Sequence, residues 1–295
     1  MSSGDTSSHV AGAMESAAQS VSTSVKAHGG LFVAQADGAF MPTLHSRGPW
    51  SLDALHGGPP AALLARAIER CDPRPDMQVA RLSVELIRPV PVSPLRVEAR
   101  VTRPGRRVQL IDATATSGEL TVAYARALRI QTGSPPIRLS PSQGAGGISP
   151  EAESLRGPDG IQPMVFPEST EPAFHSAGAE LRFEKGAFHV KGPATVWVRL
   201  LGPVVAGEVP SPLQRVAAAA DFGNGVSAEL TFGTDIFINP DLTIHLHRMP
   251  VGEWVCLDAR TWLGDPGIGM AESSLFDVAG PIGRSLQSLL VQEGR

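Results

Sequence analysis

The chain has 295 residues, which suggests about two domains, and 42% of them are hydrophobic, which is sufficient for a buried core. Its net charge of −4, from 25 basic and 29 acidic residues, provides no basic stripe and excludes a nucleic-acid-binding protein. No apolar run approaches the roughly 18 residues of a membrane helix, and the two cysteines, Cys71 and Cys256, indicate no disulfide framework.

The first 28 residues consist mostly of Ser, Ala, Gly and Thr, and the first lysine or arginine is Lys26. They lack the charged start and the apolar core of a signal peptide. We therefore expect a disordered leader over residues 1–28 and a cytoplasmic protein.

The first half of the chain predicts a strand, a helix and then about four antiparallel strands. A short apolar strand begins at Leu31. The helix runs through residues 61–68 after two prolines, which are tolerated in the first turn because those N–H groups have no partner. The strands expected after the helix are 82–88, 95–102, 108–117 and 120–130.

Residues 133–165 are rich in Gly, Ser and Pro, a composition typical of a linker. A linker of about this length can join two domains. We therefore expect an N-terminal domain over 29–132, a linker over 133–165 and a C-terminal domain over 166–295.

The second half repeats this order of elements. Strands are expected over 180–183 and 194–200. A helix follows, which Ser211 caps and Pro212 begins. The strands expected after the helix are 242–248, 254–262, 268–277 and 282–291.

One stretch of the first half recurs 160 positions later without a gap. It reads LSVELIRPVPVSPLRVEAR from Leu82 and LTIHLHRMPVGEWVCLDAR from Leu242, so that Arg88 recurs as Arg248. A period this long exceeds the roughly 20–50 residues of solenoid repeats. We expect one fold unit that is duplicated in tandem.

A long helix wrapped by an antiparallel sheet, duplicated in tandem, resembles the double hotdog fold of the α+β class. Motifs across 31–132 and 166–292 resemble acyl-CoA thioesterase II (TesB-like) proteins in their order and spacing. These motifs are His56-Gly57-Gly58, Arg88-Pro89-Val90-Pro91, Gly105-Arg106-Arg107, and Leu246-His247-Arg248 followed by Trp254.

This resemblance implies an enzyme of lipid metabolism that hydrolyses a fatty acyl-CoA to the free acid and CoA. It implies no cofactor, no metal and an acyl-CoA as the binding partner, with a homodimer of double hotdogs as one assembly. His245 and His247 alternate on one strand, but no third metal ligand is evident beside them.

The resemblance also implies the site residues. In that family an Asp on the second helix, a Ser or Thr before the repeated strand and a Gln on the last strand together hold a water. The matching positions here are Asp221, Asn239 and Gln287, of which Asn239 departs from the family pattern. The segment His56-Gly57-Gly58 is expected to bind substrate at the start of the first helix.

Each of the three catalytic candidates also has a purely structural interpretation. Asp221 could simply end its helix, Asn239 is a common turn residue before a proline, and Gln287 could point outward from its strand. From the residues alone these interpretations stay open.

Other functions also stay open. A duplicated hotdog protein that retained its acyl-binding tunnel but not its catalytic activity would be a non-catalytic acyl-CoA-binding protein. A hydratase would need the motif D-x-N-P-x-H, of which Asn239 and Pro240 are present, but Phe237 and Leu242 replace its Asp and His. The absence of G-x-S-x-G argues against a serine hydrolase.

Overall fold

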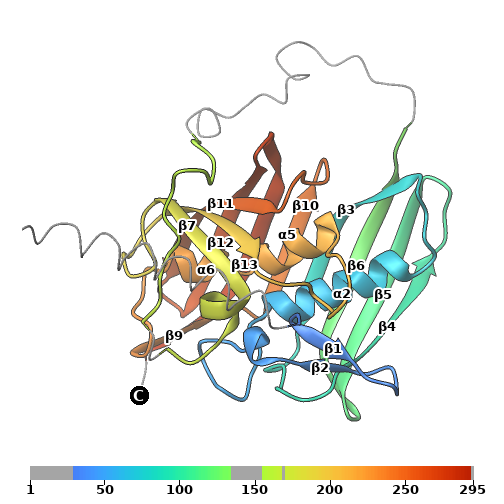
Figure 1. Cartoon of the computed structure of the whole chain (residues 1–295), viewed down its shortest axis with the longest axis horizontal. Coiled ribbons are helices and arrows are strands. Elements are labelled where there is room, and N and C mark those ends of the chain that lie inside the picture. The colour runs from blue at the N-terminus through green and yellow to red at the C-terminus, as the bar shows by residue number, and fades with distance from the viewer. Residues whose placement is uncertain (1–28, 134–154, 168–169, 294–295) are drawn as a thin grey trace, which may run out of the picture.

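The computed structural model describes residues 29–133, 155–167 and 170–293. The expected leader and most of the expected linker lie outside the described residues. Figure 1 shows two helices side by side against the curved face of a large sheet, with the N-terminal half at one end and the C-terminal half at the other.

The first half matches the expected order, with one strand, a helix and four antiparallel strands, and adds a second short strand before the helix. Its elements are β1 (Phe32–Ala34), β2 (Phe40–Pro42), a 3-10 turn (Leu44–Ser46), α2 (Gly58–Arg70), β3 (Met77–Leu86), β4 (Arg96–Arg103), β5 (Val108–Ser117) and β6 (Leu120–Gln131).

The second half repeats the pattern with two strands before its helix. Its elements are a π-helical turn η2 (Phe174–Gly178), β7 (Ala179–Lys185), β8 (Ala194–Leu200), α5 (Pro212–Ala220), α6 (Gly223–Val226), β9 (Asp235–Ile238), β10 (Asp241–Leu246), β11 (Trp254–Gly264), β12 (Ile268–Asp277) and β13 (Gly280–Glu293).

The two halves share one continuous sheet, whereas the predicted duplication of a sheet wrapped around a helix implied a separate sheet for each half. In the described ranges the strand order is β4-β5-β6-β3-β10-β13-β12-β11-β8-β7, and β9 pairs with β13. The halves meet where β3 and β10 pair antiparallel, with Ser83 opposite Thr243. Because these two residues are 160 positions apart, equivalent residues of the two copies face each other at the centre of the sheet.

The internal duplication extends well beyond the stretch that is visible in the sequence. Strands β5 and β12 have equivalent bounds, and Val108 pairs with Ile130 as Ile268 pairs with Leu290. Even the register shift recurs, after Ala115 in one half and after Leu275 in the other. The prediction of one duplicated fold unit is therefore confirmed by the strand pairing.

The two helices form the middle of the core. The apolar face of α2 is fully buried, and the alanines of α5 are buried as well, so that small side chains let the helices approach closely. A Cβ on Gly58 would lie 2.5 Å from the carbonyl oxygen of Ala218, which shows how tight this contact is. The helix pair thus fixes the position of the loop before α2 relative to the end of α5.

The helix of the second half begins where it was predicted and is shorter than the helix of the first half. Ser211 caps α5 as predicted, because its side chain accepts the backbone N–H of Gln214 at 3.1 Å. However, α5 has only nine residues, whereas α2 has 13. Gly223 and Gly225 follow it, and the low helix propensity of glycine accounts for the early end and for the short turn α6.

No helix in the described part of the chain is both long and apolar enough to cross a membrane.

Candidate active site

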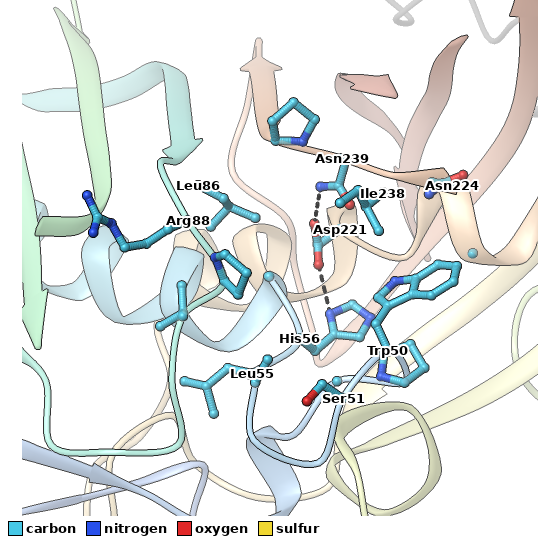
Figure 2. A pocket seen from close by; sticks show the side chains of 18 of the residues that line it. Trp50, Ser51, Leu55, His56, Leu86, Arg88, Asp221, Asn224, Ile238 and Asn239 are labelled. Carbon is cyan, nitrogen blue, oxygen red and sulfur yellow. Dashed lines mark hydrogen bonds and ion pairs between the residues drawn. The ribbon is translucent and has the colours of Figure 1, made fainter. Parts of the chain in front are cut away.

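Asp221 lies at the C-terminal end of α5, where its side chain is almost completely buried. Side chains from three other segments meet it there. His56 comes from the loop before α2, Asn239 from the segment between β9 and β10, and Gln287 from β13. The structure therefore brings all three predicted catalytic positions together, and adds His56 to them. Figure 2 shows Asp221 between Asn239 and His56.

Two side-chain amides hold the same oxygen of this carboxylate. Asn239 donates through Nδ2 to Asp221 Oδ1 at 2.8 Å, and Gln287 donates through Nε2 to that atom at 3.2 Å. Gln287 is only 2% exposed, so it does not point outward from its strand. Its Oε1 accepts the backbone N–H of Asn224 at 2.9 Å, which fixes the orientation of the amide.

The other oxygen of the carboxylate faces His56. The Nδ1 atom of His56 lies 2.7 Å from Asp221 Oδ2 and also 3.2 Å from the backbone nitrogen of Gly58. The ring packs against Phe174 and Phe222, with centroids 5.1 and 4.9 Å away. Sequence analysis placed His56 in the pocket but did not connect it with Asp221, because residues so far apart in the chain carry no signal of their contact.

The two glycines after His56 have different surroundings. A Cβ on Gly57 would lie 2.7 Å from Asp221 Oδ2, so only glycine lets the carboxylate approach the helix start. Gly57 lines the cavity beside the cluster, whereas Gly58 is buried in the contact between α2 and α5. Of the predicted substrate-binding segment, His56 and Gly57 therefore face the cavity.

A cavity of about 340 Å³ opens beside the cluster. His56, Asp221 and Asn239 line it, while Gln287 lies behind the carboxylate and is not part of the lining. Much of the remaining wall is apolar, with contributions from Trp50, Leu55, Leu86, Val90, Phe232 and Ile238. An apolar cavity with a few convergent polar groups is typical of a small-molecule site.

Asn224 is a further polar residue of the cavity wall, which sequence analysis did not identify as a candidate. It is 4% exposed, and its Nδ2 donates to the carbonyl oxygen of Phe237 at 2.8 Å. Its Oδ1 is buried and has no partner among the described residues. A buried acceptor of this kind is uncommon, because native structures satisfy most of them.

His175 lies in the π-helical turn η2, next to Phe174, which packs on His56. Burial, and to a smaller extent the electrostatic influence of the nearby His56, lower the pKa of His175 to about 4. Stacking on Phe188 and an edge contact with Phe166 surround the ring with apolar groups. His175 is therefore neutral at pH 7.

The described residues include no group of three His, Cys, Asp or Glu side chains that could hold a metal ion. Within the cluster, the Asp221 carboxylate is the group placed to act as a base. A carboxylate that is oriented by amides beside a histidine can accept a proton from a water molecule in the cavity.

Comparison with protein families gives two matches that together cover most of the chain. The model of the acyl-CoA thioesterase N-terminal domain matches residues 46–130, and the model of the acyl-CoA thioesterase C-terminal domain matches residues 158–291. A search of the curated proteins gave no match.

Solved structures show the same fold at low sequence identity. A conserved hot dog protein of Alicyclobacillus acidocaldarius is 15% identical with a TM-score of 0.63, covering 88% of this chain and 93% of its own. An acyl-CoA thioesterase II, TesB2, of Mycobacterium marinum is 16% identical with a TM-score of 0.56, covering 81% of this chain and 90% of its own. These likenesses confirm the predicted tandem hotdog fold.

Proposed function

The chain belongs to the acyl-CoA thioesterase family, and on that basis we propose that it hydrolyses the thioester of a fatty acyl-CoA to the free acid and CoA. The observation that carries this proposal is the arrangement around Asp221. A carboxylate offers about four acceptor positions. Asn239, Gln287 and His56 account for three of them, which leaves one for a water molecule at the cavity.

In this mechanism Asp221 acts as the general base. It takes a proton from the water while the water oxygen attacks the thioester carbonyl carbon. The tetrahedral intermediate then collapses, the carbon–sulfur bond breaks, and the proton passes to the departing CoA thiolate. Asn239 and Gln287 hold the carboxylate in position. The backbone N–H of Gly57 stabilises the oxyanion, because the Gly58 N–H is directed at His56 and the prolines that follow have no N–H.

The second candidate function is a non-catalytic acyl-CoA-binding protein. The observation that favours it is Asn239 at the position where the family has a hydroxyl residue. A hydratase is disfavoured by burial, because Phe237 and Leu242 are each 1% exposed and belong to the core. These apolar side chains cannot supply the acid and base that hydration requires.

The test is thiol release from acyl-CoAs of graded chain length by the purified protein. We expect Asp221→Asn to lower kcat/KM by roughly 10²- to 10⁴-fold, the range for loss of a general base. Asp265→Asn, a matched change at an exposed turn residue, is expected to keep the wild-type rate, and thermal melting shows that both variants fold.

Three results would separate the candidates. Hydrolysis that needs Asp221 supports the thioesterase. Binding of acyl-CoA without any turnover by the wild type supports the non-catalytic protein. A normal rate in Asp221→Asn contradicts the role of this carboxylate as the base.

A further inference from the structure

Arg88 is the only lysine or arginine among the described residues that line the cavity. It lies just after β3, its side chain is exposed, and no residue in the described ranges forms a hydrogen bond or an ion pair with it. An exposed arginine does not require a partner. The lack of contacts at Arg88 is therefore informative only when Arg88 is compared with the equivalent arginine of the second half.

That comparison is provided by Arg248, the equivalent residue of the second copy. The backbones correspond, because Ile87 donates to Val122 at 3.1 Å and His247 donates to Ile282 at 3.0 Å. Arg248 has a complete set of acceptors. It binds both oxygens of Asp277, at 2.5 and 2.7 Å, and the carbonyl oxygen of Gly280 at 2.9 Å.

The first copy lacks the acceptor that occupies Arg248. The position equivalent to Asp277 holds Ser117, whose hydroxyl is paired with that of Ser93 at 2.6 Å. The backbone N–H of Val251 also donates to Asp277, at 2.8 Å. Its equivalent in the first copy is Pro91, which has no N–H. Both changes remove the carboxylate site, and Arg88 is left free at the cavity.

The two sides of the cavity differ in character. In Figure 2 the Arg88 side chain extends away from the Asp221–His56 pair, and Trp50 lies on the opposite side of that pair. Trp50 packs against Phe232 and Phe237, with ring centroids 5.1 and 4.9 Å away. A thioester placed at Asp221 would thus have a cationic wall on one side and an aromatic wall on the other.

We propose that Arg88 binds an anionic group of the thioester substrate and thereby sets its direction in the cavity, with the apolar acyl chain against Trp50 and Phe232. This inference rests on the proposed thioesterase function. A guanidinium suits the task because it binds phosphate or carboxylate through two parallel hydrogen bonds. The chain as a whole carries a net charge of −4, so a local cation at the cavity favours the approach of an anionic substrate.

The anion can come from the phosphates of CoA or from a carboxylate on the acyl chain, and the test separates these sources. Rates are measured with an acyl-CoA, with the corresponding S-acyl pantetheine, which lacks phosphates, and with an S-acyl pantetheine whose acyl chain ends in a carboxylate. We expect Arg88→Gln to raise KM for acyl-CoA about tenfold, the usual effect of one charged hydrogen bond, with kcat nearly unchanged.

Two further variants make the test specific. Ser117→Asp restores the lost acid partner of Arg88 and is expected to raise KM for acyl-CoA in the same way without removing the arginine. Arg103→Gln removes an exposed arginine at the end of β4, outside the cavity lining, and controls for net charge. Melting temperatures check that each variant is folded.

The outcomes are distinct. An effect on acyl-CoA that disappears with S-acyl pantetheine assigns the anion to CoA, and an effect confined to the carboxylate-bearing substrate assigns it to the acyl chain. Equal KM changes on all three substrates, or none, overturn the proposal. If the wild type hydrolyses none of the substrates, calorimetry can still test the proposal, because anion binding does not depend on turnover. It would compare the binding of CoA and of the carboxylate-bearing thioester to wild type and to Arg88→Gln.

Discussion

Asn239 donates its side-chain amide to Asp221 at a position where the family resemblance implies a hydroxyl residue. The same Nδ2 group also lies 3.2 Å from the carbonyl oxygen of Asp241, so the amide is fixed between the carboxylate and the start of β10. Despite the departure in sequence, this position therefore supplies a hydrogen bond to the carboxylate.

The first prediction concerns this amide. Asn239→Ala removes the 2.8 Å hydrogen bond to Asp221 and is expected to lower kcat by roughly 10-fold, the value of about 1.4 kcal/mol for one hydrogen bond to a charged group. Asn239→Thr supplies a hydroxyl donor and is expected to recover part of that loss. Kinetics of thiol release measure both. A wild-type kcat in Asn239→Ala would show that Gln287 and His56 suffice to hold the carboxylate.

The second prediction concerns Gly57, whose backbone has an ordinary helical φ of −65°. Alanine there is unstrained in its backbone, but its Cβ would meet Asp221 Oδ2 at 2.7 Å. We expect Gly57→Ala to lower kcat at least 10-fold, because the carboxylate must move away from His56. Gly29→Ala is the control, since its Cβ would meet only the Ala206 Cβ, at 3.8 Å. Equal activity of the two variants would contradict the close approach of Gly57 to Asp221.

The sequence predicted most of the fold because its patterns are local. The alternation of apolar and polar residues, together with turn residues, located the strands. The pair Ser211-Pro212 located the start of α5. The two glycines after Asp221, Gly223 and Gly225, mark the end of that helix. The single continuous sheet was missed, since pairing of β3 with β10 depends on contacts between residues about 160 positions apart.

The third prediction uses the lowered pKa of His175, about 4 in the folded protein against about 6.5 in an unfolded chain. Between these pH values the unfolded chain binds a proton that the folded chain does not. The free energy of unfolding should therefore fall as the pH drops from 6.5 to 4, by up to about 1.4 kcal/mol per pH unit from this group.

Urea unfolding of His175→Phe at several pH values tests this. Phenylalanine keeps the contacts with Phe166 and Phe188 and cannot bind a proton, so the variant should lose less stability on acidification than the wild type. His245→Gln, at an exposed position on β10, should follow the wild-type curve. Parallel curves for wild type and His175→Phe would contradict a depressed pKa.

The fourth prediction concerns the buried pair of Asp277 and Arg248. Burial alone would raise the pKa of Asp277, but hydrogen bonds from Arg248 and from two backbone N–H groups, those of Val251 and Ala279, hold it below its usual value. We expect Asp277→Asn to lower the free energy of unfolding by about 2 kcal/mol at pH 7, less than a fully buried pair would lose because Arg248 is about one-third exposed.

This difference should depend on pH. A carboxyl group whose pKa is lower when folded stabilises the protein above its unfolded pKa of about 3.9, and this stabilisation is lost as the pH falls through the folded pKa. The stabilities of wild type and Asp277→Asn, measured by urea unfolding, should therefore begin to converge as the pH falls below about 4 and continue to do so through the lower pKa of the folded protein. A gap that stays constant from pH 7 to pH 3 would mean that the charge of Asp277 contributes nothing.

The site was predictable only as far as the family resemblance reached. It identified Asp221, Asn239 and Gln287, which lie together, but it gave no contact between His56 and Asp221 and no role for Asn224. These relationships depend on how α2 packs on α5 and on how Gln287 meets the backbone of Asn224, and neither contact leaves a pattern in the residues. The different surroundings of Arg88 and Arg248 were missed for the same reason, because they depend on contacts with residues distant in the chain, such as Asp277.

The pairing of β3 with β10 has a consequence for either half taken alone. A separated N-terminal copy would expose the open edge of β3, and a separated C-terminal copy would expose that of β10. Unprotected edges of this length recruit other strands and promote aggregation. If the gene were divided into two, each fragment would therefore aggregate without the other. The two halves should assemble when they are co-expressed, but not when they are purified separately and then mixed.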